Sequence, residues 1–363
     1  MVRRVLFVLP DFFAGGAQKV MISLAEGLDP ARYEPAIVVV NGSGPWRERV
    51  PDRIPVTDLG KGNLRTGLPA LLKALRETKA DTVVSTMGYL NLGVLLLKPW
   101  SGRKRRFIVR EANALVPEGT DALTAATRKA AYRALYGRAD HIVSPSQRIA
   151  DELSSGFGLD TSRLVVLRNP VAVDELRERA LPLRRHEGKG PRYVCVGRLS
   201  RQKAYTRLLD MLAAHDVDGH VTILGEGPER EALEDRIASL RLEQRITLAG
   251  FDPDPAPWVA GADALLLPSL WEGLSNVALE ALALGTPVIA TPEAGAISEI
   301  ASLASPGSVT VAPMGDAFAR AMEQVSPQRR KRLRASLLPR DFLPGNVNKQ
   351  FETLLEDRAD ARG

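Results

Sequence analysis

The stretch PRYVCVGRLSRQKAYTRLLDMLAAH, residues 191–215, indicates the fold of this 363-residue chain. The apolar run YVCV ends at a glycine and a polar loop, and an amphipathic run with Leu208, Leu209 and Leu212 follows. This order predicts a buried strand, a loop and a helix, which is the repeating unit of a parallel sheet. Because the stretch lies past the middle of the chain, it indicates that a second domain begins there.

The same alternation continues on both sides of this stretch. Upstream, RVLFVLP (4–10) precedes AQKVMISLAEGL (17–28), and downstream HVTILGEGP (220–228) precedes EREALEDRIASLR (229–241). A single hydrophobic core rarely keeps growing to this chain length, so we expect two tandem doubly wound, Rossmann-like α/β domains that face a central cleft. The predicted divisions are residues 1–173 for the N-terminal domain, 174–191 for a polar linker, 192–338 for the C-terminal domain and 339–363 for a C-terminal helix.

Composition narrows the class of protein. Hydrophobic residues make up 45% and charged residues 25% of the chain, which is typical of a folded globular protein. Cys195 is the only cysteine, which excludes an internal disulfide and a site with several cysteine ligands. No apolar run approaches the roughly 18 residues that span a bilayer, and the start lacks the core of a signal peptide. We therefore expect a cytoplasmic protein.

The basic residues are clustered, although 49 Lys and Arg against 43 Asp and Glu give a net charge of only +6. Residues 103–106 (RKRR) follow an apolar run, and Arg128, Lys129, Arg133 and Arg138 lie on a helix-like stretch. Two interpretations stay open: a solvated face beside a buried strand, or contact with an anionic membrane, which would place the protein peripherally on the inner face of the cytoplasmic membrane. With aromatic residues at 5% and no nucleic-acid-binding motif, we expect no nucleic-acid partner.

Three loops follow predicted strands at their carboxyl ends, where open parallel sheets bind ligands. Their glycines let a backbone approach a ligand closely, and a helix N-terminus attracts an anion. A guanidinium and an ammonium in the second loop suit one anionic pocket. Plain tight turns and surface charges remain the alternatives. The loop residues are Gly15 and Gly16 in the first, Gly197, Arg198 and Lys203 in the second, and Gly225 and Gly227 in the third.

Two carboxylates stand eight positions apart in EGLSNVALE, residues 272–280. Glu272 falls in the loop after a predicted buried strand, and Glu280 falls about one turn into the next helix. A carboxylate at each place can accept hydrogen bonds from sugar hydroxyls or a ribose, with phosphate held between them on backbone N–H groups at the helix N-terminus. A helix-dipole role for Glu280 and an exposed turn for Glu272 are the alternatives.

At these residues the chain resembles the family 4 retaining glycosyltransferases, which have the GT-B fold, over nearly its whole length. The resemblance rests on GGAQK, VGRLSRQK, LGEGPERE, AGFDPD and EGLSNVALE. It implies sugar transfer from a nucleotide-sugar donor with retained configuration and no cofactor. Arg198 and Lys203 would neutralise the donor diphosphate, Glu272 would contact the donor sugar and Glu280 the ribose. The other donor-binding positions that it implies are Gly197, Gly225, Gly227, Gly273, Leu274, Ser275 and Asn276.

The acceptor side departs from the family pattern. Gly15 and Gly16 would face the acceptor, but Gln18 stands where an acid is frequent and Ala204 where many relatives have glycine. Many relatives also place a histidine near the acceptor. In the corresponding region this chain has Arg110, Glu111 and Asn113. Family precedent further implies that the C-terminal helix packs back on the N-terminal domain.

These observations predict a metal-independent hexosyltransferase or N-acetylhexosaminyltransferase that uses a UDP-sugar and acts on a glycan acceptor, with a lipid-linked acceptor as one alternative. The expected setting is biosynthesis of a cell-surface polysaccharide or glycoconjugate. Asp252 and Asp254 match an Asp-x-Asp metal motif of another fold but lie in a proline-rich turn, so we expect no metal. The rival functions are a nucleotide-sugar epimerase and a non-catalytic glycan-binding subunit. An epimerase needs acid and base groups at the sugar, and none of the four histidines falls in a cleft loop.

Overall fold

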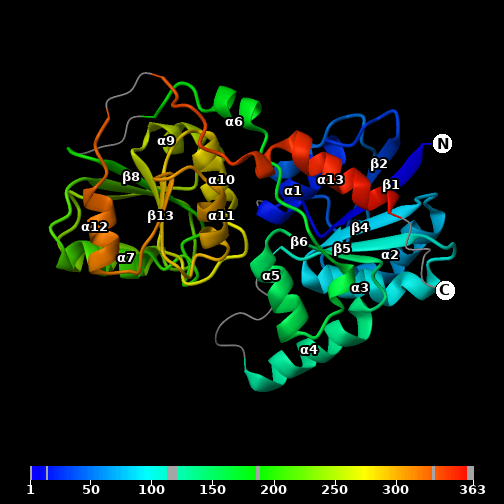
Figure 1. The fold of residues 1–363 in the computed structure, drawn as a ribbon. Helices are drawn as coiled ribbons and strands as arrows, with labels where there is room; N and C mark the ends of the chain where they lie inside the picture. The colour runs from blue at the N-terminus through cyan, green and yellow to red at the C-terminus, as the bar shows by residue number, and fades with distance from the viewer. Residues whose placement is uncertain (1, 14, 113–120, 185–188, 329–331, 358–363) are drawn as a thin grey trace. The chain divides into compact units, whose positions relative to one another are not determined.

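The chain forms two compact units in a computed structural model, which describes residues 2–13, 15–112, 121–184, 189–328 and 332–357. Unit 1 comprises Met1–Pro170 and Pro344–Gly363, and unit 2 comprises Val171–Leu343. Each unit is built around one parallel sheet with helices on both faces (Figure 1). The prediction of two doubly wound α/β domains is confirmed.

The unit 1 sheet has seven parallel strands in the order β3-β2-β1-β4-β5-β6-β7. The chain reverses its direction of travel across the sheet between β1 and β4, which creates a switch point at the carboxyl ends of these strands. The strands are β1 Arg3–Leu9, β2 Tyr33–Val39, β3 Val56–Asp58, β4 Thr82–Thr86, β5 Arg106–Arg110, β6 His141–Ser144 and β7 Leu164–Val166. The helices are α1 Gly16–Glu26, α2 Leu64–Glu77, α3 Gly88–Leu97, α4 Ala122–Tyr136, α5 Gln147–Asp151 and α13 Pro344–Glu356.

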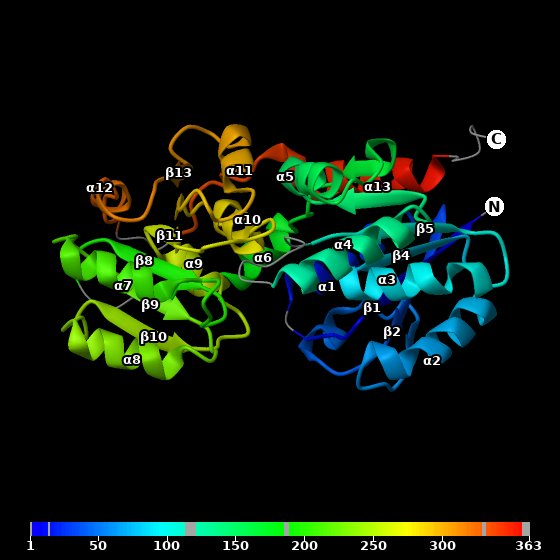
Figure 2. The ribbon, with the colours of Figure 1, turned by 90° about the horizontal axis from the view of Figure 1, so that it is seen from below.

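Helix α13 returns from the end of the chain to cover one face of the unit 1 sheet, and α2 lies on the opposite face (Figure 2). The ring of Phe351 lies 6.1 Å from that of Phe7 on β1. At the rim of this contact, Arg3 donates a hydrogen bond to the Leu355 carbonyl at 2.9 Å. An apolar helix stripe of this kind needs a sheet face to bury it, which explains why distant segments share one core.

Unit 2 has six parallel strands in the order β10-β9-β8-β11-β12-β13. Helices α7, α8 and α12 cover one face, and α6, α9, α10 and α11 the other. The strands are β8 Arg192–Val196, β9 His220–Leu224, β10 Ile246–Gly250, β11 Ala264–Leu267, β12 Val288–Ala290 and β13 Val309–Val311. The helices are α6 Val173–Arg179, α7 Tyr205–Ala214, α8 Arg230–Ser239, α9 Ala256–Gly261, α10 Asn276–Ala283, α11 Ile297–Leu303 and α12 Asp316–Glu323.

The domain boundaries differ from the predicted ones. The region predicted as a linker, residues 174–191, belongs to unit 2, because α6 packs there against α9 and α10. Arg179 of α6 pairs with Asp254 at 2.6 Å, so the polar composition of this region reflects helix contacts within the unit. The predicted C-terminal segment also starts too early: Phe342 is buried in the unit 2 core, and only the chain from Pro344 onward joins unit 1.

Candidate functional site

A partly buried ion pair joins two loops at the carboxyl ends of the unit 2 strands. The Lys203 Nζ lies 2.5 Å from the Glu272 Oε1, and the two side chains are only 16% and 11% exposed. The Ser269 hydroxyl donates to the same carboxylate oxygen at 2.9 Å. Because a partly buried pair is screened little by solvent, it fixes both groups at one place. The sequence assigned these two residues to different parts of a donor, and the structure places them side by side.

Gln202 ties the same loops together through the backbone. Its side-chain amide donates to the Trp271 carbonyl at 3.0 Å, and its own carbonyl accepts from the Leu270 N–H at 2.9 Å. Sequence analysis missed this residue, because a glutamine in a polar loop gives no signal of a partner 69 positions away. Its position between Arg198 and Lys203 in the motif VGRLSRQK was the only available hint.

Close packing of two loops explains why positions 225 and 227 are glycine, without any ligand. A Cβ atom at Gly225 would lie 2.0 Å from the Gly197 carbonyl oxygen, and one at Gly227 would lie 2.2 Å from the Leu199 carbonyl oxygen. The two loops also share a backbone hydrogen bond from the Leu199 N–H to the Glu226 carbonyl at 3.0 Å. The glycines therefore let the third loop support the loop that carries Arg198. Donor contact by Gly197, Gly225 and Gly227 stays a prediction.

The N-terminus of α10 carries unused hydrogen-bonding capacity. Ser275 is the N-cap residue, yet its side chain makes no capping hydrogen bond. The residue is only 4% exposed, and its buried hydroxyl has no partner among the described residues. The first N–H groups of any helix lack an intrahelical acceptor, and they attract anions. Gly273 and Leu274 are buried just before this end, Asn276 opens the helix, and Glu280 follows half-buried one turn later.

Arg198 lies on the loop after β8 and is exposed. Its guanidinium has no hydrogen bond or ion pair with any residue of the described ranges, in contrast to Lys203. A guanidinium can fork two phosphate oxygens. Arg198 is thus available for a phosphate ligand, whereas a ligand at Lys203 has to share the ammonium with Glu272.

Ala204 adopts a left-handed backbone conformation, φ +52° and ψ +41°, as the N-cap of α7. A side chain in this region costs roughly 1–2 kcal/mol that glycine avoids. We expect Ala204→Gly to stabilise the protein by roughly 1 kcal/mol, measured as the melting temperature. The matched control is Ala213→Gly within α7, which should destabilise by up to about 1 kcal/mol. Equal destabilisation by both changes would contradict the expected strain.

In unit 1, the loop before α1 is shaped by Gln18. Its amide donates to the Asp11 carboxylate at 3.0 Å, and the same carboxylate oxygen accepts the Phe13 N–H. A Cβ atom at Gly15 would lie 2.4 Å from the Gln18 side-chain oxygen, so the glycine lets the buried glutamine fold over the loop. Gln18 therefore organises this loop from inside. An acceptor contact by Gly15 and Gly16 stays a prediction.

Glu111 lies in a buried network at the carboxyl end of β5 and is 3% exposed. Its carboxylate accepts hydrogen bonds from the Asn91 amide at 2.9 Å and from the Tyr132 and Tyr136 hydroxyls. Burial raises its pKa to about 7, against the opposing effect of these hydrogen bonds and of Arg110. The carboxylate is thus directed into the unit, which gives it a structural role. Its role as an acceptor contact stays a prediction.

Arg110 precedes this carboxylate and is also buried. It donates to the Asn169 side-chain oxygen at 2.5 Å, while its other terminal nitrogen has no partner among the described residues. Burial lowers its pKa to about 10, and Glu111 opposes that effect. Asn113, the third residue predicted on this side, lies outside the described residues.

The remaining chemical motifs have local explanations. Asp252 accepts a hydrogen bond from the Trp258 indole at 2.9 Å, and Asp254 pairs with Arg179. Within the described ranges no group of three or more His, Cys, Asp or Glu residues could hold a metal ion. Cys195 is buried in the unit 2 core, where burial raises the pKa of its thiol. In the same ranges no helix has the length and apolar character that crossing a membrane requires.

Comparison with known families covers both units. The sequence model described as Glycosyltransferase Family 4 matches residues 14–175, and the one described as Glycosyl transferases group 1 matches residues 179–336. Together they cover almost all of the two Rossmann-like units that contain the loops above. The chain belongs to the family 4 glycosyltransferases of the GT-B fold.

Curated relatives are similar over parts of the chain. It is 27% identical over 229 residues to the Campylobacter jejuni N-acetylgalactosamine-N,N'-diacetylbacillosaminyl-diphospho-undecaprenol 4-alpha-N-acetylgalactosaminyltransferase. This match covers 63% of this chain and 62% of that enzyme. It is 28% identical over 349 residues to the Streptomyces fradiae 2-deoxystreptamine N-acetyl-D-glucosaminyltransferase. This match covers 84% of this chain and 80% of that enzyme. The chain thus spans less than two thirds of the first relative and most of the second.

Solved structures share the fold over nearly the whole chain. The Anabaena protein HepE, solved in complex with UDP and glucose, gives a TM-score of 0.73 at 17% identity and covers 98% of this chain and 99% of that one. Sucrose-phosphate synthase from Thermosynechococcus elongatus gives 0.74 at 16% identity, covering 98% of each chain. At these identities the likeness establishes the arrangement of strands and helices.

Proposed function

We propose that this protein transfers a sugar from a nucleotide-sugar donor to a glycan acceptor. The observation that carries the proposal is the group of polar residues at the carboxyl end of the unit 2 sheet: the Lys203–Glu272 pair, the buried Ser275 hydroxyl without a partner among the described residues, and the exposed Arg198. Sugar hydroxyls, phosphate and ribose are the groups that carboxylates, cations and a helix N-terminus accept. The Campylobacter and Streptomyces relatives named above, both glycosyltransferases, support it.

In the proposed reaction, the bond between the donor sugar and the diphosphate breaks while the acceptor hydroxyl forms a new bond on the same face of the sugar. Configuration is therefore retained, and the leaving phosphate takes the acceptor proton. Arg198 and Lys203 stabilise the negative charge that develops on the departing diphosphate. Glu272 holds hydroxyls of the donor sugar beside Lys203, and Glu280 holds the ribose. No divalent metal is needed when two cationic side chains neutralise the diphosphate.

The proposed donor is a UDP-hexose or a UDP-N-acetylhexosamine, and the proposed acceptor is a glycan on a lipid carrier. Two similar proteins support these two parts: one structural neighbour was solved with UDP and glucose, and the Campylobacter enzyme acts on a sugar linked to diphospho-undecaprenol. We propose a cytoplasmic protein that works peripherally on a membrane surface. Sedimentation with phosphatidylglycerol vesicles tests that last part.

The structure corrects which basic residues are available to a membrane. Arg105 is buried, and Arg106 is half-buried and donates to backbone carbonyls at the end of α13, including that of Leu354. Only Arg103 and Lys104 of this run are exposed, beside Trp100, which is 54% exposed. A tryptophan next to basic residues is typical of a membrane interface. The proposed membrane contact therefore rests on fewer cations than the sequence suggested.

Calorimetric titration without divalent metal tests the donor assignment. UDP, GDP, ADP and their sugars are titrated into the wild type and into Glu280→Gln. We expect micromolar binding of one nucleotide and binding about ten-fold weaker in the variant, because a carboxylate that holds a ribose diol contributes about 1.4 kcal/mol. Circular dichroism of the variant controls for folding.

Each result bears on a different rival. Absence of binding by any nucleotide would contradict the proposal and favour a glycan-binding subunit. If a nucleotide-sugar binds, analysis of the product from that sugar without acceptor separates transfer from epimerisation. Release of an epimerised nucleotide-sugar would overturn the transfer assignment, and an α- or β-linked product with acceptor reports retention or inversion.

A further inference from the structure

An open basic pocket of about 570 Å³ lies on unit 1, around residues 103–105 and away from the proposed donor and acceptor residues. It is formed by the turn after α3, the loop that enters β5, and the residues just before β6 and β7. It thus lies at the amino ends of these strands, whereas Arg110 and Glu111 lie at the carboxyl end of β5. The donor and acceptor positions of the proposed function are therefore not part of it.

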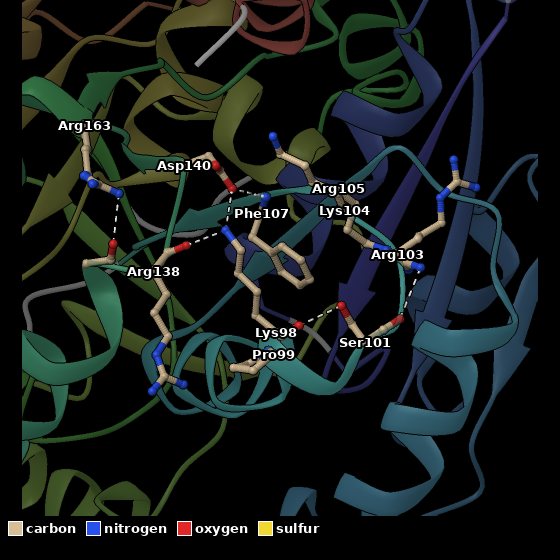
Figure 3. Close-up of a pocket in the computed structure, with 11 residues that line it drawn as sticks. Lys98, Pro99, Ser101, Arg103, Lys104, Arg105, Phe107, Arg138, Asp140 and Arg163 are labelled. Carbon is tan, nitrogen blue, oxygen red and sulfur yellow. Dashed lines mark hydrogen bonds and ion pairs between the residues drawn. The ribbon is translucent and has the colours of Figure 1, made fainter. Parts of the chain in front are cut away.

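The lining of this pocket carries far more positive than negative charge. Asp140 is its one acid, and its carboxylate accepts hydrogen bonds from the Lys98 ammonium and the Phe107 N–H, both at 2.8 Å. Figure 3 shows Lys98 between the Asp140 carboxylate and the Arg138 carbonyl, with Arg163 on one side and residues 103–105 on the other. The cationic lining residues are Lys98, Arg103, Lys104, Arg105, Arg138 and Arg163.

Arg105 is the strongest indication of a ligand, because it is only 6% exposed. Its terminal nitrogens donate to the Leu75 carbonyl at 2.5 Å and to the Ser101 carbonyl at 3.4 Å, but its Nε has no partner within the described ranges. No carboxylate in those ranges accepts a hydrogen bond from it. Buried charges in proteins are normally paired, since removing a charge from water is costly.

The environment of Arg105 adds to this cost. Burial lowers the pKa of its guanidinium, the neighbouring Arg103 acts in the same direction, and Asp81 opposes both. Arg103 reaches Asp81 only at 3.5 Å, a weak ion pair at the surface. The local charge therefore remains in excess, and an anion entering the pocket would relieve it.

We propose that this pocket binds a phosphate-bearing anion at the amino ends of β5, β6 and β7. Guanidinium groups fork phosphate oxygens and an ammonium adds a point charge, so a lining with several of both suits a doubly or triply charged phosphate group. The group comes either from a lipid headgroup or from a soluble phosphate compound. This binding is independent of the donor and acceptor, and the pyrophosphate titration tests it separately from sugar transfer. Only its lipid-headgroup form rests on the proposed membrane contact, which shares Arg103 and Lys104 with the pocket.

Pyrophosphate is the first probe, titrated by calorimetry into the full-length protein. The pocket variant Lys104→Gln/Arg138→Gln removes two exposed cations, and the control variant Arg65→Gln/Lys73→Gln removes two exposed cations from α2. We expect binding at least ten-fold weaker in the pocket variant and unchanged in the control. Because Arg198 is the proposed contact of the donor diphosphate, the pocket and control variants are also compared in an Arg198→Gln background, where the difference between them should persist. Melting temperatures without the probe verify that the variants fold.

Vesicles distinguish the two sources of phosphate. If the ligand is a headgroup, phosphatidylglycerol vesicles sediment the wild type but not the pocket variant, phosphatidylcholine vesicles sediment neither, and pyrophosphate displaces the protein. If it is a soluble compound, pyrophosphate binds and the vesicles do not. Equal pyrophosphate binding by the pocket and control variants would overturn the proposal. So would the absence of pyrophosphate binding, or vesicle binding that pyrophosphate does not compete with.

Discussion

Lys203→Ala is expected to lower kcat by about 100- to 1,000-fold while changing the Kd of the donor much less. The proposed role of its ammonium is to stabilise charge that develops on the leaving diphosphate, and removing one such group costs about 3–4 kcal/mol of transition-state stabilisation. Arg198 remains to bind the diphosphate in the ground state. Steady-state kinetics and donor titration, read together, separate the two effects.

The matched comparison is Glu280→Gln, which should weaken donor binding and reduce kcat less than Lys203→Ala does. Lys203 also neutralises the Glu272 carboxylate, which is only 11% exposed, so the alanine variant leaves that carboxylate without its cation. Lys203→Ala/Glu272→Gln tests whether this unpaired charge, rather than the lost ammonium, causes the defect. Recovery of kcat to near the wild-type value in the double variant would contradict the proposed role of Lys203. Arg236→Ala, at an exposed ion pair on α8, controls for loss of a unit 2 cation.

Glu111 is expected to make the protein less stable as the pH rises from about 5 to 8. Its pKa is raised by burial from an ordinary value of 4.5 to about 7, so the folded state holds its proton over a range in which the unfolded state has lost it. Stability linked to this group is fully present below pH 4.5 and is lost through pH 7. The loss is about 3 kcal/mol, since each factor of ten in the proton equilibrium corresponds to 1.36 kcal/mol.

Urea denaturation at pH 5.5 and pH 8.5 measures this effect as a difference between variants. Glu111→Gln keeps an oxygen for Asn91 and the two tyrosines but has no titrating proton, so the difference in unfolding free energy between the two pH values should shrink by about 2 kcal/mol, since the rest of the loss lies below pH 5.5. Glu34→Gln, a change of an exposed carboxylate on β2, should behave as the wild type. The same pH dependence in Glu111→Gln as in wild type would show that another group is responsible.

Most of the fold was predictable, because apolar periodicity and glycine loops report directly on strands, helices and turns. The exceptions are segments whose polar residues pair with each other. The residues of α6 looked like a linker because Glu175 and Arg179 are charged, yet they form an ion pair at 3.2 Å along the helix while Leu176 is buried. Likewise, residues 103–106 look uniformly basic, although β5 begins within them and directs Arg106 to α13.

The candidate site was also predictable only in part. Local motifs predicted Arg198, Lys203, Glu272 and Glu280 as site residues, because a loop between a strand and a helix has a fixed place at the carboxyl end of its sheet. The sequence by itself thus determined the two doubly wound units and the family of the protein. Only the tertiary structure decided that Lys203 and Glu272 form a pair, that Glu111 lies in a buried network and that Arg105 is buried with no carboxylate partner in the part of the chain that the structure describes. Burial and charge pairing depend on which side chains from distant segments pack together, and the local sequence does not specify that packing.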